Sequence, residues 1–221
     1  KIGGITTLED ARAAESAGAD FLGFIFEASS PRSVSVEDAA GIISKLSGTA
    51  KTVGVFVESD ADFIRRAALE CGLFALQLHG GQSDNFARGL SGISQEIWRT
   101  VWVGCAADLQ SARSLEADVL VADSRSGKTV GGTGKVCDWS LAESLAKSRK
   151  IALAGGINCQ NAAQAALSVN PWILDANSGV EISPRRKDPA KIENLIKNFD
   201  KALSHPDKTD LKKLEKIIKN M

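Results

Sequence analysis

Short apolar runs alternate with amphipathic stretches along most of the chain. Eight such runs occur, at residues 1–4, 21–25, 52–57, 75–78, 97–103, 119–122, 151–154 and 172–175. Most of them are followed by a segment in which apolar side chains recur at helical spacing. This alternation is typical of parallel βαβ units, and eight strands are the number that closes a (β/α)8 barrel.

The helical segments expected between the runs have recognisable capping residues. They cover residues 8–17, 36–46, 60–71, 107–115, 138–146, 161–167 and 189–203, with a weaker signal at 84–90. The candidate N-caps are Thr7, Ser35, Ser59 and Asp138, and the candidate C-terminal stops are Gly18 and Gly72. Local signals and the number of strands therefore predict the same architecture.

Two α/β folds use such units, the closed barrel and the doubly wound open sheet. No Gly-x-Gly-x-x-Gly follows the first run, and polar or glycine-rich residues gather after nearly every run, as a closed ring of loops requires. We therefore predict an α/β fold, a single (β/α)8 TIM barrel, over residues 1–204.

Residues 205–221 differ in character from the rest of the chain. Apolar residues stand at helical spacing among lysines in this tail, namely Leu211, Leu214, Ile217 and Ile218. The spacing predicts an extra C-terminal amphipathic helix that packs outside the barrel or frays. A partner-binding role is the alternative.

Composition narrows the class of ligand. The 27 Lys and Arg residues balance the 27 Asp and Glu residues, so no overall field favours nucleic acid or a membrane, and a small molecule is the expected partner. The four cysteines lie far apart without a Cys-x-x-Cys pair, which predicts free thiols, and two histidines exclude a three-histidine metal site. No run of about 18 apolar residues and no leader appears, so we expect a cytoplasmic protein, as a monomer or a homodimer.

The stretch at residues 119–134 is the first candidate for chemistry. Four apolar residues form a buried strand that stops at Asp123, and a loop with Gly131, Gly132 and Gly134 follows. In barrel enzymes the carboxyl ends of the strands form the floor of the active site, so Asp123 is placed to exchange protons and the loop to close over a ligand. The alternative is that Asp123 only caps a helix or turn.

Two further glycine-bearing turns follow the last two runs, at residues 153–158 and 175–181. Backbone N–H groups of the last two strand loops commonly bind phosphate in barrels, and glycine allows a close approach. Gly155, Gly156 and Gly179 in these turns are therefore candidate phosphate ligands. The alternative is that these glycines only make tight turns.

Three other side chains belong to the same predicted ring of strand ends. Arg32 follows the second run and can fork onto a carboxylate or phosphate, His79 closes the fourth run, and Asp175 ends the eighth. The alternatives are that Arg32 is a solvated loop residue and that His79 is a hydrogen-bonded structural histidine. The basic run at residues 185–187 is expected to be a solvated turn.

These residues together resemble one family, phosphoribosylanthranilate isomerase of tryptophan biosynthesis. The resemblance rests on Lys-Ile-x-Gly-Ile-Thr (1–6), Gly-Ala-Asp-Phe-Leu-Gly-Phe-Ile-Phe (18–26), Ser-Pro-Arg (30–32), Val-Gly-Val-Phe-Val (53–57), Gln-Leu-His-Gly (77–80), Gly-Gly-Thr-Gly (131–134), Leu-Ala-Gly-Gly (153–156), Asn-Ser-Gly-Val-Glu (177–181) and Lys-Asp (187–188). It implies an Amadori rearrangement of N-(5'-phosphoribosyl)anthranilate without cofactor or metal. It also implies that Asp123 is the general acid, that Arg32 holds the anthranilate carboxylate, and that His79 and Asp175 line the site. The phosphate-binding residues it implies are Gly155, Gly156, Ser178 and Gly179.

One residue departs from the family pattern. The family carries a cysteine, whose thiolate takes the C2' proton, where this chain has Gly3. Three accounts stay open. Gly3 is an introduced or variant residue, or another group such as Cys105 or a water replaces the base. The third is that the chain is a divergent barrel that binds a phosphosugar without turning it over, or catalyses a related isomerisation that needs only the acid. A histidine-pathway isomerase is a further rival, but it would need an aspartate where Gly3 stands.

Overall fold

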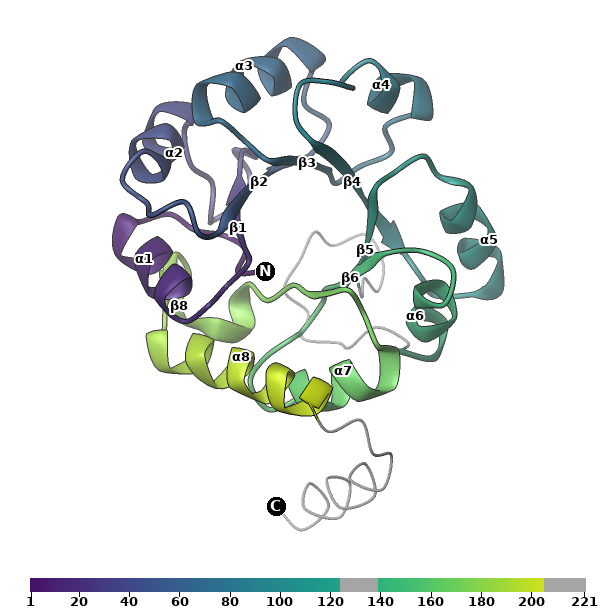
Figure 1. Ribbon diagram of the computed structural model, residues 1–221. Helices are drawn as coiled ribbons and strands as arrows, with labels where there is room; N and C mark the ends of the chain where they lie inside the picture. The colour runs from purple at the N-terminus through teal and green to yellow at the C-terminus, as the bar shows by residue number, and fades with distance from the viewer. Residues whose placement is uncertain (124–138, 205–221) are drawn as a thin grey trace.

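A seven-stranded parallel sheet forms the centre of the molecule in the computed structural model, which describes residues 1–123 and 139–204. The strands lie side by side in chain order: β1 (Phe21–Ile25), β2 (Lys51–Phe56), β3 (Ala75–Leu78), β4 (Glu96–Trp102), β5 (Val119–Asp123), β6 (Ile151–Leu153) and β7 (Ile173–Leu174). Figure 1 shows the sheet curled around a centre, with the helices outside it. A doubly wound sheet reverses its strand order partway, so this sequential order excludes that rival.

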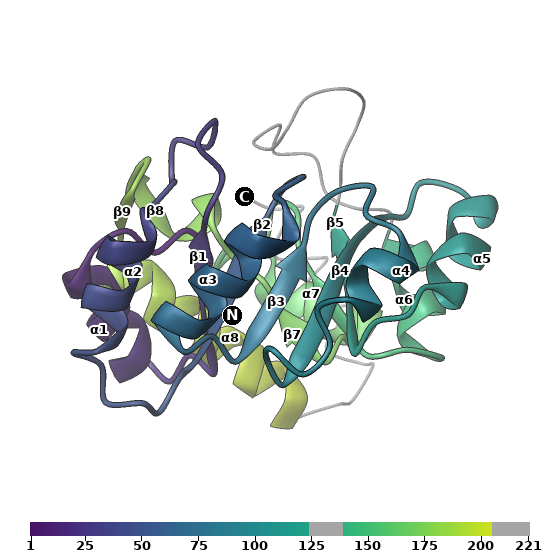
Figure 2. The same ribbon diagram turned by 90° about the horizontal axis from the view of Figure 1, so that it is seen from above.

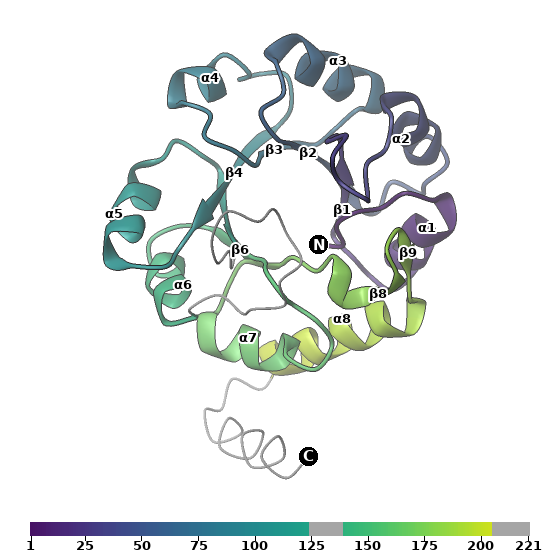
Figure 3. The same ribbon diagram turned by 180° about the vertical axis from the view of Figure 1, so that it is seen from behind.

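The helices form the outer layer. They are α1 (Leu8–Ser16), α2 (Val36–Ile43), α3 (Ala61–Cys71), α4 (Asp84–Arg88), α5 (Ala106–Ser114), α6 (Trp139–Ala146), α7 (Ala162–Val169) and α8 (Pro189–Ser204). Seen from behind, α8 lies beside both α7 and α1, so the last helix described completes the layer next to the first (Figure 3). Among the described residues no helix is long and apolar enough to span a membrane.

The predicted first strand, residues 1–4, is present only as single bridges at Ile2. Ile2 pairs in parallel with Leu22 of β1 and with Ala176, which follows β7. Its N–H donates to the carbonyl of Phe21 at 2.9 Å, and the next N–H, of Gly3, donates to the carbonyl of Ala176 at 2.8 Å. The segment thus contacts both edges of the sheet. It stays short because Gly4 takes a φ of +67°, outside strand geometry.

Alternation along the strands separates two cores. Inside the curled sheet lie Phe21, Val53, Ala75, Trp98, Val119, Val121, Ala152, Ala154 and Ile173. The residues between them face outward and pack under the helices in a second cluster. Trp98 is fully buried and meets Phe21 edge-on at 5.1 Å between ring centroids. This apolar cluster fills much of the interior, and the polar side chains of the candidate site lie towards the carboxyl ends of the strands.

Several helix ends are as predicted. The Thr7 hydroxyl accepts the Asp10 N–H at 3.1 Å, and Gly72 ends α3 in the left-handed region at a φ of +59°. The prediction of Ser59 as a cap was wrong, because Asp60 caps α3 instead and accepts the Phe63 N–H at 2.8 Å. Asp138 and the tail at residues 205–221 lie outside the described residues.

A 3-10 turn and a small hairpin after β7 were not predicted. The turn η1 (Ser178–Val180) leads into two antiparallel strands, β8 (Glu181–Ser183) and β9 (Arg186–Lys187). Figure 2 shows this hairpin at the end of the molecule towards which the strands run. The prediction of a solvated basic turn is wrong for Lys187, because β9 turns its side chain inward and buries it completely. Arg185 and Arg186 are exposed.

Candidate active site

Asp123 is the last residue of β5 and stands opposite Trp102 of β4 in the register of the sheet. Val119 and Val121 lie in the inner core, so alternation along the strand directs the half-buried Asp123 inward as well. The structure therefore confirms that a buried strand ends in this carboxylate. Gly131, Gly132 and Gly134, the glycines expected to form a loop over it, lie outside the described residues.

His79 and Cys105 follow β3 and β4. The His79 N–H donates to the carbonyl of Phe56 at 2.8 Å, and alternation from Ala75 puts its side chain on the inner side of the sheet. Cys105 is exposed at the N-cap of α5. Since β4 lies four positions along the curled sheet from the Ile2 segment, Cys105 stands far from Gly3 and is poorly placed to replace a base there.

A network of hydrogen-bonded polar side chains crosses the interior just below the strand ends. The ammonium of Lys1 donates to Asp175 Oδ2 at 2.6 Å and to Gln77 Oε1 at 3.0 Å, and Gln77 Nε2 donates to Thr100 Oγ1 at 3.1 Å. Gly23 makes room for it, because a Cβ there would lie 3.1 Å from Lys1 Cε. Sequence reasoning missed this network, although a lysine and a glutamine inside buried runs were a signal.

The two candidate phosphate loops meet. A Cβ on Gly179 would overlap the carbonyl oxygen of Ile157, so only glycine permits this approach between the loops after β6 and β7. Gly155 and Gly156 take φ values of +80° and +70°, which other residues rarely adopt. No hydrogen bond between described residues uses the N–H groups of these three glycines or of Ser178, so the structure leaves four donors near one place.

Two asparagines hold the loop after β6 in shape. Asn158 Oδ1 accepts the N–H groups of Gln160 and Asn161 at 2.9 and 3.1 Å, and Asn161 Oδ1 accepts the N–H of Asn158 at 2.9 Å. Both side-chain amides also donate to the carbonyl of Gly156, at 3.1 and 2.9 Å. These two hydrogen bonds hold the Gly156 carbonyl in place. They thereby fix the orientation of the neighbouring peptide units, whose N–H groups are unused.

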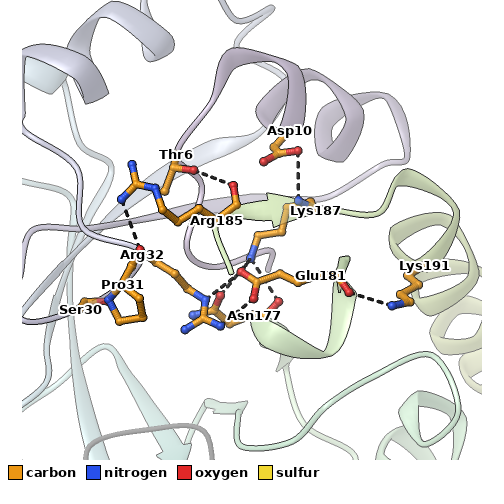
Figure 4. Close-up of polar contacts among 10 residues, drawn as sticks. All are labelled: Thr6, Asp10, Ser30, Pro31, Arg32, Asn177, Glu181, Arg185, Lys187 and Lys191. Atoms are coloured by element: carbon orange, nitrogen blue, oxygen red, sulfur yellow. Dashed lines mark hydrogen bonds and ion pairs between the residues drawn. The ribbon is translucent and has the colours of Figure 1, made fainter. Parts of the chain in front are cut away.

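Arg32 lies at the same mouth but is already paired (Figure 4). Its Nε and Nη2 donate to the two carboxylate oxygens of Glu181 at 2.8 and 2.6 Å. Lys187 Nζ donates to the same carboxylate at 2.9 Å and to Asn177 Oδ1 at 2.9 Å. A Cβ on Gly4 would lie 2.8 Å from Arg32 Cδ, so the arginine packs directly over the residue after Gly3. Glu181 was missed as the residue that orients Arg32.

Burial and charge oppose each other in this cluster. Burial disfavours the charged form of Glu181, but hydrogen bonds and charges from Arg32 and Lys187 outweigh it and place the pKa of Glu181 below its ordinary value. Burial lowers the pKa of Lys187 despite its pairing with Glu181. The hydrogen bond to Glu181 raises the pKa of Arg32. The three side chains therefore form one charged cluster. Glu181 and Lys187 come from the hairpin, and Arg32 comes from the loop after β1.

The lowered pKa of Glu181 predicts a pH effect on stability. Between the native pKa and the unfolded value of about 4.3, the unfolded state binds the extra proton, so the free energy of unfolding falls as pH drops through this window. Glu181→Gln should flatten this acid limb in urea titrations, whereas Glu193→Gln, exposed on α8, should leave its slope unchanged. Equal slopes for the wild type and Glu181→Gln would contradict the pairing.

The fold and the carboxylate at the end of β5 define a class, α/β enzymes built on a curled sheet of parallel strands. A sequence model described as N-(5'phosphoribosyl)anthranilate (PRA) isomerase matches residues 1–198. The chain therefore belongs to the PRA isomerase family.

Individual relatives agree with this assignment. N-(5'-phosphoribosyl)anthranilate isomerase of Citrifermentans bemidjiense is 42% identical over 196 residues, which cover 89% of this chain and 94% of that protein. The crystal structure of phosphoribosyl anthranilate isomerase from Thermotoga maritima has a TM-score of 0.83 at 35% identity, covering 90% of this chain and 97% of that one. A PRA isomerase structure in complex with reduced 1-(o-carboxyphenylamino)-1-deoxyribulose 5-phosphate has a TM-score of 0.80 at 33% identity, with 90% and 96% covered.

Proposed function

We propose that this chain converts N-(5'-phosphoribosyl)anthranilate into 1-(2-carboxyphenylamino)-1-deoxyribulose 5-phosphate, a step of tryptophan biosynthesis. The observation that carries the proposal is the meeting of two glycine loops, at Gly179 and Ile157, on the rim that also holds Asp123. Family membership and the product-like ligand of a related structure support the same reaction.

The phosphate is assigned to the four N–H groups of Gly155, Gly156, Ser178 and Gly179. These donors are unused by other described residues, and converging backbone N–H groups suit an anion. The glycines let the phosphate approach the backbone closely.

The anthranilate carboxylate is assigned to Arg32. A guanidinium has five N–H donors, and Glu181 takes only two of them here, so the remaining edge can bind a second carboxylate. Glu181 acts as a positioning residue, because its two hydrogen bonds fix the plane of the guanidinium. His79 is assigned to the wall of the site.

Asp123 is assigned to the ring-opening step. Its carboxylic acid donates a proton to the ribose ring oxygen, the bond from C1' to that oxygen breaks, and the nitrogen lone pair forms an iminium ion. The C2' proton is then acidified by the iminium, and its removal gives an enolamine that tautomerises to the ketone. The rearrangement moves protons within one molecule and consumes no redox cofactor.

The proposal extends to the closure of the barrel, the oligomeric state and the cellular location. The bridges of Ile2 to Leu22 and Ala176 support a closed (β/α)8 barrel over residues 1–204, with the Ile2 segment as its eighth strand. The Thermotoga maritima relative is a dimeric isomerase, which favours a homodimer over a monomer for this chain. A cytoplasmic location fits an enzyme of amino-acid biosynthesis.

Gly3 favours one rival, a barrel that binds phosphosugars without turning them over. The test is a fluorescence turnover assay on freshly generated PRA, run beside binding of the reduced product analogue. Turnover supports the proposal. Binding without turnover would establish the rival, and isomerisation of a histidine-pathway aminoaldose instead of PRA would assign the other isomerase activity.

The assignment of Arg32 has its own prediction. Arg32→Met removes charge-assisted hydrogen bonds of about 1.5–3 kcal/mol, so the KM for PRA should rise about 10- to 100-fold, with a smaller effect on kcat. Arg12→Met, on the exposed face of α1, is the matched control and should leave KM unchanged. An unchanged KM in Arg32→Met would mean that the carboxylate binds elsewhere.

A further inference from the structure

Neither backbone conformation nor packing requires glycine at position 3. Gly3 does not have a positive φ, unlike its neighbour Gly4. A Cβ on Gly3 would meet ordinary van der Waals neighbours, the nearest being Asp175 Oδ1 at 3.4 Å, followed by Asn177 Cβ at 3.6 Å. The glycine therefore leaves a space at the mouth, and a carboxylate oxygen borders that space.

The carboxylate of Asp175 is held by one oxygen only. Oδ2 accepts from Lys1 Nζ at 2.6 Å, and the lysine is fixed in turn by Gln77 at 3.0 Å. None of the hydrogen bonds among residues 1–123 and 139–204 ends on Oδ1, the oxygen beside Gly3. The Asp175 side chain is 9% exposed against 3% for Lys1, so the aspartate is the member of the pair that keeps contact with the mouth.

We propose that Asp175 is the catalytic base of this chain and removes the C2' proton through Oδ1. The inference rests on the proposed isomerase function, and it replaces the thiolate that the family pattern puts at position 3. Asp175 follows β7 and Asp123 ends β5, so the base and the acid stand on strands separated by β6. Two groups at different points of the rim can address the ring oxygen and C2' separately.

The proton inventory balances with these two carboxyl groups. Asp123 loses its proton to the ring oxygen as the ring opens. Asp175 then takes the C2' proton, while the C–H electron pair forms the C1'=C2' bond and the iminium pair returns to nitrogen. In the last step the Asp175 proton goes to C1' and the enol proton leaves O2' for Asp123, which restores both groups and yields the ketone.

Lys1 and Gln77 are positioning residues in this scheme. While Asp175 is ionised, the ammonium neutralises it inside the barrel. When Asp175 carries the proton, Lys1 keeps its hydrogen bond to Gln77 Oε1, and Gln77 keeps its own to Thr100. The proton transfer therefore leaves the buried Lys1 ammonium with a hydrogen-bond partner.

The experiment measures PRA turnover and binding of the reduced product analogue in the same set of variants. Asp175→Asn should lower kcat by about 10²- to 10⁴-fold and leave analogue affinity within about threefold. Gly3→Cys in the Asp175→Asn background should recover at least about tenfold of the lost rate, because a thiolate then stands beside the lost oxygen. Asp20→Asn, exposed before β1, is the matched control and should behave as the wild type.

Asp175→Asn also leaves Lys1 without its counter-charge, which can destabilise the barrel. Lys1→Met/Asp175→Asn removes both charges and is measured alongside, and analogue binding identifies the folded variants. Turnover within about fivefold of the wild type in either folded variant overturns the proposal and leaves the isomerase function standing. A wild type that binds the analogue but turns over no PRA overturns the inference and the proposed function together.

Discussion

Asp123→Asn is expected to lower kcat for PRA by about 10³-fold while the reduced product analogue still binds within a few-fold. Asparagine has nearly the same shape at the end of β5, so the sheet and the loops around it should be undisturbed. It carries no proton that it can give to the ribose oxygen, and the ring-opening step therefore loses its acid. Steady-state fluorescence kinetics and analogue titration on the same preparation measure both effects.

A second substitution at position 123 provides a comparison that tests the acid role. Asp123→Glu keeps an acidic group and should retain more activity than Asp123→Asn, whereas Asp20→Asn should retain all of it. If Asp123→Asn kept more than about a tenth of the wild-type kcat, another group would be the acid, because general acid catalysis contributes at least about 10²-fold.

Gly179→Ala should produce the second large effect. The added Cβ overlaps the Ile157 carbonyl, so the loops after β6 and β7 must move apart. We expect the KM for PRA to rise about 100-fold, because the N–H groups of the two loops no longer converge on one phosphate. The free energy of unfolding should fall by about 1–3 kcal/mol, as for other overpacked sites. Kinetics and urea unfolding measure the two changes.

Gly41→Ala supplies the control for this substitution. Gly41 lies in α2, and nothing stands within 4 Å of a Cβ placed there, so the same added methyl group should be neutral or stabilising. If Gly179→Ala weakened the fold but left KM unchanged, the loops would touch for stability alone and the phosphate would bind elsewhere.

Periodicity and capping residues predicted most of the fold. The bounds of β1 and β3 were predicted to the residue, and most helices were placed within a few residues of their observed ends. These patterns report which side of a local element is buried, and short-range spacing determines that. The segment at residues 1–4 was overestimated as a strand, because sequence patterning does not reveal that Gly4 turns the backbone away.

The partners of the candidate residues were less predictable. Arg32 was expected at the mouth, but its pairing with Glu181, 149 residues further along the chain, was not. Lys187 was expected in solvent, yet the hairpin β8–β9 buries it against the same carboxylate. Both misses concern contacts between segments far apart in sequence, for which a single sequence carries no periodic signal.

The sequence by itself determined the strand and helix order, the buried strand that ends at Asp123, the two glycine loops and the absence of a cysteine at position 3. Local spacing and residue chemistry suffice for these. Only the tertiary structure decided that Gly179 touches Ile157, and that Asp175 meets Lys1 across 174 positions with one oxygen turned to the space beside Gly3. The curl of the sheet brings the segment at residues 1–4 beside the loop after β7, and that juxtaposition has no local cause.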